Sequence, residues 1–260
     1  MQRGIIVIMN PQQTELWKNN KIIKNYGTIS IPRFPEAKSF CDRCELHEQA
    51  HHVGIATEWF AGMWGTLETR ADRNLPTILI IGQNPGWHED KAGKPFVGRS
   101  GDVLKKSYLE GIQLSKRANL WLSNGVRCHT TNNQVPKPKH YRECNQHLIE
   151  DLKILIPDLV LTLGAPATTS FYKNILGITK ISLKKSFTMN GNLYTPDDHR
   201  LGYDFQFNMF STYHPAAVMR NGNLINSVHS HMQLISDCID GTMASPSTPE
   251  IIPTRSPNES

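Results

Sequence analysis

The sequence predicts an α/β protein with three layers, in which a mainly parallel, four-stranded central sheet carries helices on both faces. Short apolar runs of strand length alternate with longer segments whose apolar residues recur at helical spacing. Strands that are separated by helices require right-handed crossover connections, which produce a parallel sheet covered on both sides. With 260 residues and 38% apolar content, the chain is long enough to bury a sizeable core.

Eight elements make up this prediction, and Gly or Pro marks several of their ends. The predicted strands are 77–81, 119–123, 158–163 and 207–213. The predicted helices are 100–111, with Ser100 as its N-cap, 140–156, which stops at Pro157, 165–172 and 224–238. The segment 173–206 fits this alternation poorly, and we expect it to be an excursion from the sheet.

The two ends of the chain differ in composition from its middle. We expect an N-terminal extension over 1–39, one domain over 40–240, and a disordered tail over 241–260, which is rich in Pro, Ser and Thr. No stretch approaches the length of a membrane span, and the apolar run before Pro11 is too short for a signal sequence. We therefore expect a cytoplasmic protein, and we expect it to be a monomer. The net charge of +5 and the pI near 8.9 are compatible with a polyanionic partner.

Polar residues follow directly after the predicted strands. The stretch TILIIGQNPGWH ends a buried strand on Gly82–Gly86, and Asn124, Gly164 and His214 come at or just after the ends of the other three strands. Ligands of open parallel sheets bind beyond the carboxyl ends of the strands. Each of these residues alone is an ordinary turn or loop residue, but together at one edge they indicate a binding site.

Three motifs occupy these positions in order: GQNPGWHEDKAGKPFVGRSGDVL, LSNGVRC and YHPAAVMRNGN. They resemble the successive motifs of the uracil-DNA glycosylase superfamily, and most closely those of its family-four, iron-sulfur branch. The resemblance covers roughly residues 40–240, which it identifies as a uracil-DNA glycosylase-like domain. It implies a DNA partner and an enzyme that flips out a pyrimidine, hydrolyses its N-glycosidic bond and leaves an abasic site.

Five cysteines test this resemblance separately. Cys41 and Cys44 form a C-x2-C pair, while Cys128 and Cys144 have fifteen residues between them. Zinc is the general interpretation of such a set, but the wide second spacing does not suit a zinc ribbon. It matches the family-four arrangement, which implies a 4Fe-4S cluster on these four thiolates, with a structural role. Cys238 is left over and is expected to be a core residue.

The resemblance also assigns roles to the residues that follow the strands. Asn84 and His214 are the expected catalytic residues: Asn84 would place a water near C1′, and His214 would donate a hydrogen bond to O2 of the departing pyrimidine. Either a neutral or a charged imidazole could do so. Gln83, Phe96 and Asn124 would contact the base, Asn124 by its edge and Phe96 by stacking. Gln83 stands where family-four enzymes usually carry Glu, and an amide orients water but is a poor base. Core packing is the alternative role for Phe96.

Five further residues are expected to contact DNA. Met219 and Arg220 would form the wedge that enters the duplex from the minor groove and fills the gap left by the flipped base. Pro85, Gly86 and Ser211 would grip phosphates, together with backbone amides. Lys91 and Lys94 lie in a charged turn and not after a strand, so we expect neither to act as a Schiff-base nucleophile.

The substrate base is less well determined. In the uracil-strict branch, a bulky aromatic residue follows the first-motif proline and blocks the C5 position of the pyrimidine. Gly86 stands there in this chain, so C5-substituted pyrimidines fit sterically. Three functions stay open: a repair glycosylase for uracil or a related deaminated base, an antiviral defence glycosylase that excises hypermodified cytosine (for example glycosylated 5-hydroxymethylcytosine) from phage DNA, and a DNA-binding relative without catalysis. The presence of Asn84 and His214 argues against the third.

Overall fold

A six-stranded sheet forms the centre of the computed structural model, which describes residues 41–60, 75–178, 192–194 and 207–241. The strand order is β1-β3-β2-β4-β6-β5. The inner four strands, β3, β2, β4 and β6, are parallel to one another. At the two edges, β1 pairs antiparallel with β3, and β5 pairs antiparallel with β6. The strands are β1 (Glu58–Trp59), β2 (Thr77–Gly82), β3 (Asn119–Asn124), β4 (Leu159–Leu163), β5 (Asn192–Tyr194) and β6 (Phe207–Thr212).

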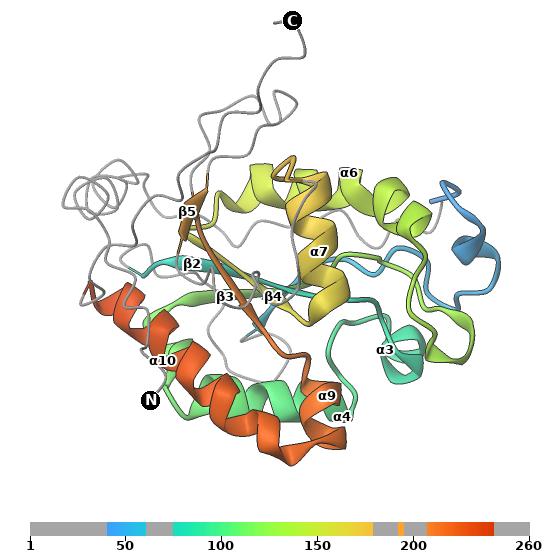
Figure 1. Cartoon of the computed structure of the whole chain (residues 1–260). Coiled ribbons are helices and arrows are strands. Elements are labelled where there is room, and N and C mark those ends of the chain that lie inside the picture. Colours follow the sequence, from blue (N-terminus) through green and yellow to red (C-terminus); the bar gives the residue numbers. More distant parts are fainter. Residues whose placement is uncertain (1–40, 61–74, 179–191, 195–206, 242–260) are drawn as a thin grey trace, which may run out of the picture.

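Helices cover both faces of this sheet, so the predicted three-layer α/β fold is confirmed (Figure 1). One face carries α6 (Pro138–Leu155) and α7 (Ala165–Asn174). The other carries α4 (Arg99–Val103), its π-helical continuation η2 (Leu104–Glu110), α5 (Leu114–Arg117), α9 (Pro215–Arg220) and α10 (Ile225–Asp240). The remaining helices are η1 (Glu45–Glu48), α3 (Trp87–Ala92), η3 (Thr131–Asn133) and η5 (Gly222–Leu224).

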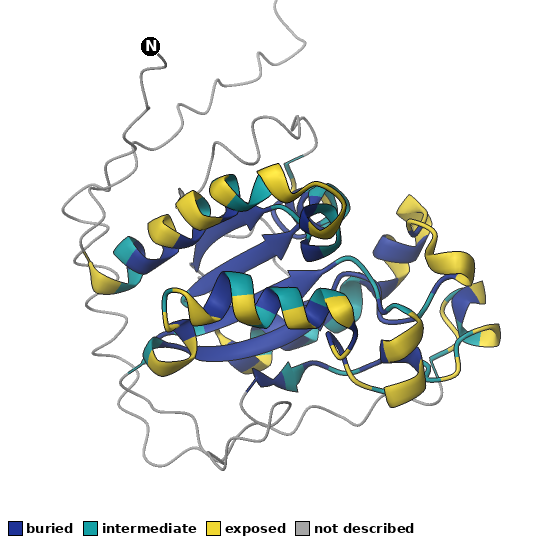
Figure 2. Cartoon of the chain, turned by 90° about the horizontal axis from the view of Figure 1, so that it is seen from below, coloured by how far each residue is buried: buried dark blue, intermediate teal, exposed yellow. Residues whose placement is uncertain are grey.

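Alternation along β2 explains why both faces need cover. Ile78 and Ile80 pack into the core beneath α10, whereas Leu79 and Ile81 pack into the core beneath α6, and all four are at most 1% exposed. Successive side chains of a strand point to opposite faces, so a continuous apolar run is buried on both sides. The four inner strands are accordingly buried along almost their whole length, and the helices that cover them expose mainly their outer sides (Figure 2).

The predicted elements are all present, with shifts of a few residues and one wrong cap. Gly98, and not Ser100, is the N-cap of α4, and Ser100 lies inside the helix. The edge strands β1 and β5 and the short helices α3, α5 and α9 were not predicted. Strand β5 lies within the predicted excursion 173–206 and pairs with β6, while 179–191 and 195–206 lie outside the described residues.

The predicted ends of the chain also lie outside the described residues. These are the proposed extension over 1–39 and the tail, except for Gly241, which caps α10 in a left-handed conformation at φ 69°. Among the described residues, no helix is both long and apolar enough to cross a bilayer.

Candidate active site

The carboxyl ends of the inner strands bring the predicted polar residues to one edge of the sheet. Gly82 and Asn124 are direct neighbours, because they end the paired strands β2 and β3 in register. On the other side of β2, Gly164 follows β4 and donates its N–H to Thr212 O of β6 at 2.7 Å. A Cβ atom on Gly164 would lie 2.9 Å from Cβ of His214. The loops after β4 and β6 therefore touch.

Gly82 provides room for two of the predicted base-binding side chains. A Cβ atom at this position would lie 2.5 Å from Asn124 Oδ1 and 2.6 Å from Cζ of Phe96. Both side chains are buried, at 5% exposure each. The Phe96 ring also belongs to the core beneath α10, so the core-packing role holds, while the tip of the ring reaches the end of β2 beside Asn124.

The backbone at Phe96 is held in an unusual conformation. Its φ is 55°, in the left-handed region that residues other than glycine seldom adopt. A Cβ atom on Gly101 would come within 1.7 Å of the Phe96 carbonyl oxygen, so only glycine lets α4 pack this closely. Backbone strain of this kind gathers at functional sites, where the surrounding packing enforces it.

A network of amide hydrogen bonds organises the first loop. Gln83 Nε2 donates to Asn84 Oδ1 at 3.1 Å. Asn84 Nδ2 donates to the Pro85 carbonyl at 2.9 Å and to Thr130 Oγ1 at 3.3 Å. His129 Nδ1 also lies 3.1 Å from the Pro85 carbonyl, which can only accept, so Nδ1 of His129 carries the proton. The loop after β3 thus packs directly against the loop after β2.

Glu89 joins the two halves of the first motif. Its carboxylate accepts from the backbone N–H of Gly98 at 2.7 Å and from that of Gly86 at 3.1 Å. The side chain is only 9% exposed. Glu89 therefore holds the loop after β2 against the start of α4 and is part of the frame of the site.

His214 is held as a neutral imidazole. It is the N-cap of α9, and its Nδ1 accepts a hydrogen bond from the Ala216 N–H at 3.1 Å. Burial of the ring, with a smaller contribution from the positive charge of Arg220, lowers the pKa of His214 from 6.5 to about 4. A neutral ring that accepts at Nδ1 carries its proton on Nε2. Nε2–H is thus the donor that His214 can offer to a ligand.

Three of the four predicted cysteine ligands, Cys44, Cys128 and Cys144, belong to one small core. It lies at the end of the molecule where the first described segment meets the start of α6 (Figure 1). Cys128 and Cys144 are buried side by side, and Cys44 packs against them. Burial raises the pKa of the Cys44 thiol, and the nearby Cys41 adds to this rise electrostatically. Burial raises the pKa of the thiols of Cys128 and Cys144 to about 11 and about 12.

Two backbone groups point at these sulfurs. Gly54 N–H lies 3.3 Å from Cys128 Sγ, and the Arg127 N–H donates to Cys144 Sγ. Such donors stabilise the thiolates of an iron-sulfur cluster, so the donor set fits one. In the described part of the chain, no three His, Cys, Asp or Glu side chains have the arrangement that holds a metal ion. Cys238 lies apart in the core beneath α10, as predicted.

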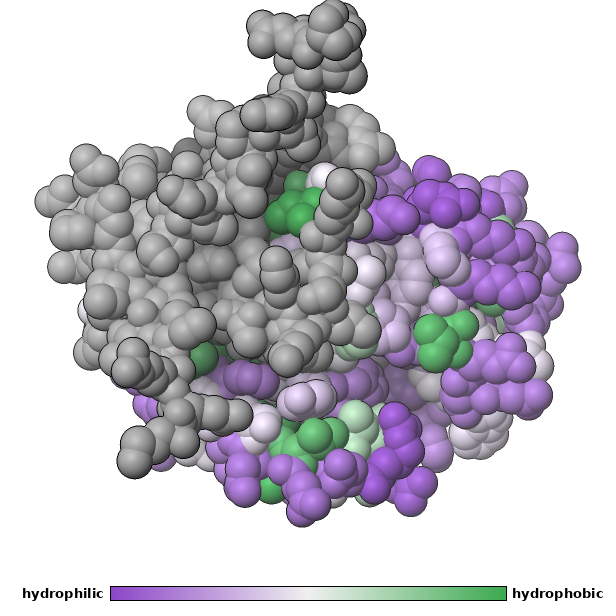
Figure 3. Space-filling view, viewed as in Figure 1, coloured by the Kyte–Doolittle hydropathy of each residue, from purple (hydrophilic) through white to green (hydrophobic). Residues whose placement is uncertain are grey.

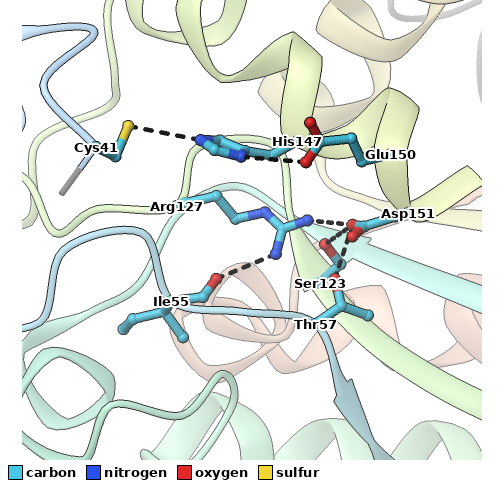
Figure 4. Close-up of polar contacts among 8 residues, drawn as sticks. All are labelled: Cys41, Ile55, Thr57, Ser123, Arg127, His147, Glu150 and Asp151. Atoms are coloured by element: carbon cyan, nitrogen blue, oxygen red, sulfur yellow. Dashed lines mark hydrogen bonds and ion pairs between the residues drawn. The ribbon is translucent and has the colours of Figure 1, made fainter. Parts of the chain in front are cut away.

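A buried ion pair supports this end of the molecule (Figure 4). Arg127 contacts Asp151 of α6, and both side chains are 5% exposed. Asp151 also accepts from the hydroxyls of Thr57 at 2.7 Å and Ser123 at 3.1 Å, and Arg127 donates to the Ile55 carbonyl at 3.1 Å. Burial raises the pKa of Asp151, and Arg127 opposes that rise. The pair links α6, β3 and the first described segment.

The family model for the uracil-DNA glycosylase superfamily matches residues 71–232, which include the carboxyl ends of β2, β3, β4 and β6. The chain belongs to this superfamily. A type-4 uracil-DNA glycosylase of Thermotoga maritima is 32% identical over 182 residues, which cover 70% of this chain and 79% of the relative. Type-4 uracil-DNA glycosylases of Pyrobaculum aerophilum and Saccharolobus solfataricus are 28% and 31% identical, over 74% and 55% of this chain and 86% and 62% of their own lengths.

The superfamily resemblance predicted five DNA contacts, and the structure leaves two of these residues exposed. Met219 is 42% exposed on α9, and Arg220 follows it at the surface. Ser211 is fully buried inside β6, with its hydroxyl 3.0 Å from Thr162 Oγ1. The hydroxyl lies on the face of the sheet that α7 covers, because Thr162 Oγ1 also contacts Thr168 Oγ1 of α7 at 2.8 Å. The phosphate contact expected of this residue stays a prediction.

The other two predicted phosphate contacts are also engaged within the protein. Pro85 is buried, has no N–H, and its carbonyl accepts from Asn84 and His129. The Gly86 N–H already donates to Glu89. The described surface is largely hydrophilic on the face drawn in Figure 3, with isolated apolar side chains. Trp87 and Val97 in the first motif, Met219 in the third, and Val135, which follows the second motif, are exposed apolar residues.

Sequence reasoning missed three residues of this candidate site. Glu89 lies within the quoted first motif, and its spacing of three residues from a helix N-cap at Gly86 is a signal that could have found it. His129 and Thr130 reach the first loop from the loop after β3, across more than forty residues of sequence. No pattern of neighbouring residues predicts such contacts.

Proposed function

We propose that this chain is a monofunctional DNA glycosylase that flips uracil out of DNA and hydrolyses its N-glycosidic bond, leaving an abasic site. One observation supports this most directly: neutral His214, with its donor on Nε2, lies at the same sheet edge as the hydrogen-bonded amide of Asn84. The type-4 uracil-DNA glycosylases named above are consistent with this activity.

The proposed chemistry divides between these two residues. Cleavage of the glycosidic bond places negative charge on the departing base and positive charge on the sugar. His214 donates from Nε2 to O2 of the base, which stabilises the developing anion without a proton transfer. Asn84 positions a water for attack on C1′. Because an amide is a poor base, bond cleavage runs ahead of the attack by water.

Base recognition falls to the side chains around Gly82. Asn124 contacts the edge of the flipped pyrimidine, and the tip of the Phe96 ring stacks on its face, a contact that contributes about 1 to 3 kcal/mol. Met219 and Arg220 occupy the duplex where the nucleotide leaves it. Their exposure on α9, directly after His214, supports this placement.

A 4Fe-4S cluster on Cys41, Cys44, Cys128 and Cys144 is part of this proposal. Cys44, Cys128 and Cys144 share one small core, Cys41 acts electrostatically on Cys44, and backbone N–H groups face two of the four sulfurs. Bound there, the cluster joins the first described segment to the loop after β3 and to α6, and hydrolysis requires no electrons from it. Its role is therefore structural.

Excision of a C5-modified pyrimidine is the second candidate function. Gly86 has no side chain to close the C5 side of the base, and a Cβ atom there would lie 2.8 Å from Glu89 Oε2. Any larger residue at position 86 must displace Glu89, so the opening is built into the packing of the motif. Hypermodified cytosines of viral DNA, which a defence enzyme would attack, belong to this class.

A panel of oligonucleotides tests both functions. Duplexes carry uracil, thymine mismatches, hypoxanthine, 5-substituted cytosines or glycosylated 5-hydroxymethylcytosine, and alkali reveals abasic sites. We expect release of uracil, and release of a larger base would favour the second candidate. Asn84→Ala and His214→Ala should each lower the rate by about 100- to 1,000-fold while DNA binding is retained. Release of no base by the wild type would support the non-catalytic alternative.

A further inference from the structure

The hydrogen bonds around Asn84 form a chain in which every donor and acceptor is determined. It ends at the backbone carbonyl of Gln134, which can only accept, so the Thr130 hydroxyl donates to it, at 2.5 Å. A threonine hydroxyl has one proton. Towards Asn84 Nδ2, 3.3 Å away, Thr130 Oγ1 must therefore act as the acceptor.

This polarity orients the amide of Asn84. Both Nδ2 protons are used, one by Thr130 and one by the Pro85 carbonyl at 2.9 Å. Oδ1 accepts from Gln83 Nε2 at 3.1 Å. An amide oxygen has two lone pairs, so a single acceptor position on Oδ1 is the hydrogen-bonding capacity that Asn84 has left for a ligand.

We infer that Gln83 and Thr130 are positioning residues that lock the Asn84 amide so that it presents only an acceptor to the attacking water. The inference rests on the proposed function, in which Asn84 holds that water. A water that donates one proton to Oδ1 is oriented, and its own lone pair is free to face C1′. If the amide turned over, Nδ2 would instead take up that lone pair.

Because Asn84 Oδ1 acts as an acceptor, the residue at position 83 must supply a hydrogen-bond donor, which the Gln83 amide does. Gln83 is anchored through its backbone, because its carbonyl accepts from the Val126 N–H at 3.0 Å. An ionised carboxylate at the same place has only acceptors and cannot donate to Asn84 Oδ1. Two facing acceptors would repel each other and release the amide. Gln83 is thus assigned to Asn84 in addition to any contact with the base.

Thr130 provides the first test, with a matched control. Thr130→Val keeps the shape of the buried side chain, which is 4% exposed, but removes the hydroxyl, whereas Thr130→Ser keeps the hydroxyl. On a uracil oligonucleotide in single-turnover conditions, we expect Val to lower the rate by about 10- to 100-fold without weakening DNA binding. Ser should restore most of it. Equal rates for Val and wild type would overturn the inference.

Gln83→Glu distinguishes a hydrogen-bond donor at position 83 from a residue that is needed only for packing. A protonated carboxylic acid at this position can donate to Asn84 Oδ1, and an ionised one cannot. The ratio of the variant rate to the wild-type rate should therefore rise as the pH falls from about 7 to about 5, as the introduced carboxylate gains its proton. The ratio cancels effects common to both proteins. A ratio that does not change with pH contradicts the polarity argued here.

A measurement without substrate separates this inference from the proposed function. In the ¹⁵N-labelled full chain, both Nδ2 protons of Asn84 should exchange slowly with solvent, faster in Thr130→Val, and slowly again in Thr130→Ser. Rapid exchange in the wild type would overturn the lock even if the enzyme releases uracil. Slow exchange in a protein that releases no base would keep the lock and reject the function.

Discussion

The Nδ1 atom of His214 accepts the Ala216 N–H at 3.1 Å, so the helix that follows His214 sets which nitrogen of its ring carries the proton. The sequence left a neutral and a charged imidazole open for this residue. Burial of the ring, helped by the charge of Arg220, lowers its pKa to about 4, which selects the neutral form near pH 7. In the proposed function, stabilisation of the leaving base would therefore come from a hydrogen bond and not from a full positive charge.

This tautomer predicts a pH profile. Because the pKa of His214 is lowered to about 4, the neutral ring prevails above that pH, and base release should stay level between about pH 5 and 7. Below about pH 4 the ring is protonated, Nδ1 loses its acceptor role, and the rate should fall. Single-turnover rates across this range check the prediction. A rate that rises on acidification through pH 5 would indicate a charged catalytic histidine.

The ionisation of His214 also predicts a trend in stability. Its pKa in the folded protein is about 4, below the value of 6.5 for an unperturbed histidine, so the unfolded chain binds more protons between these values. Its contribution to stability is therefore complete above about pH 6.5 and declines as the pH falls towards 4. Denaturant unfolding at several pH values measures this, and the decline attributable to His214 should be absent from His214→Ala.

The reaction product should be an intact strand with an abasic site. A bifunctional enzyme needs an amine nucleophile, and among the described residues no lysine follows β2, β3, β4 or β6 directly. Lys91 and Lys94 are both exposed. Strands should therefore remain uncut until alkali is added, and borohydride should trap no protein-DNA adduct. An adduct that disappears on mutation of either lysine would show a Schiff-base mechanism.

The cysteine cluster predicts a coloured protein. The purified full chain should be brown, with broad visible absorbance, and Cys128→Ala should bleach it and lower its unfolding temperature. Cys238→Ala is the control, because Cys238 is equally buried but lies in the core beneath α10. It should keep the colour. A colourless, fully active protein that contains zinc would rule out the iron-sulfur assignment.

The buried ion pair between Arg127 and Asp151 predicts a large loss of stability. Arg127→Met leaves the Asp151 carboxylate buried without its cation, which should cost about 3 to 5 kcal/mol of the free energy of unfolding. Lys139→Ala, which removes an exposed partner of Glu45, should change it little. Denaturant unfolding measures both. Adding Asp151→Leu to Arg127→Met should recover part of the loss, and equal losses in the two single variants would contradict the argument.

The sequence by itself determined the parallel core and the edge at which the site lies. Continuous apolar runs such as 77–81 can only be buried on both faces, and a parallel sheet then brings every strand end to one side. Asn84, Asn124 and His214 were therefore predicted at one edge from their positions alone. The short edge strand β1, only two residues long, carries too little pattern to be found in this way.

Only the tertiary structure decided what each side chain faces. Ser211 and Gly86 were predicted to meet DNA, but the Ser211 hydroxyl contacts Thr162 of the neighbouring strand and the Gly86 N–H donates to Glu89. Asn84 Nδ2 donates to Thr130 Oγ1, which lies 46 residues further along the chain. Local spacing predicts which elements form, because it acts within a few residues. Hydrogen-bond polarity, tautomers and burial depend on groups that the fold brings together from distant segments, and these decide the chemistry.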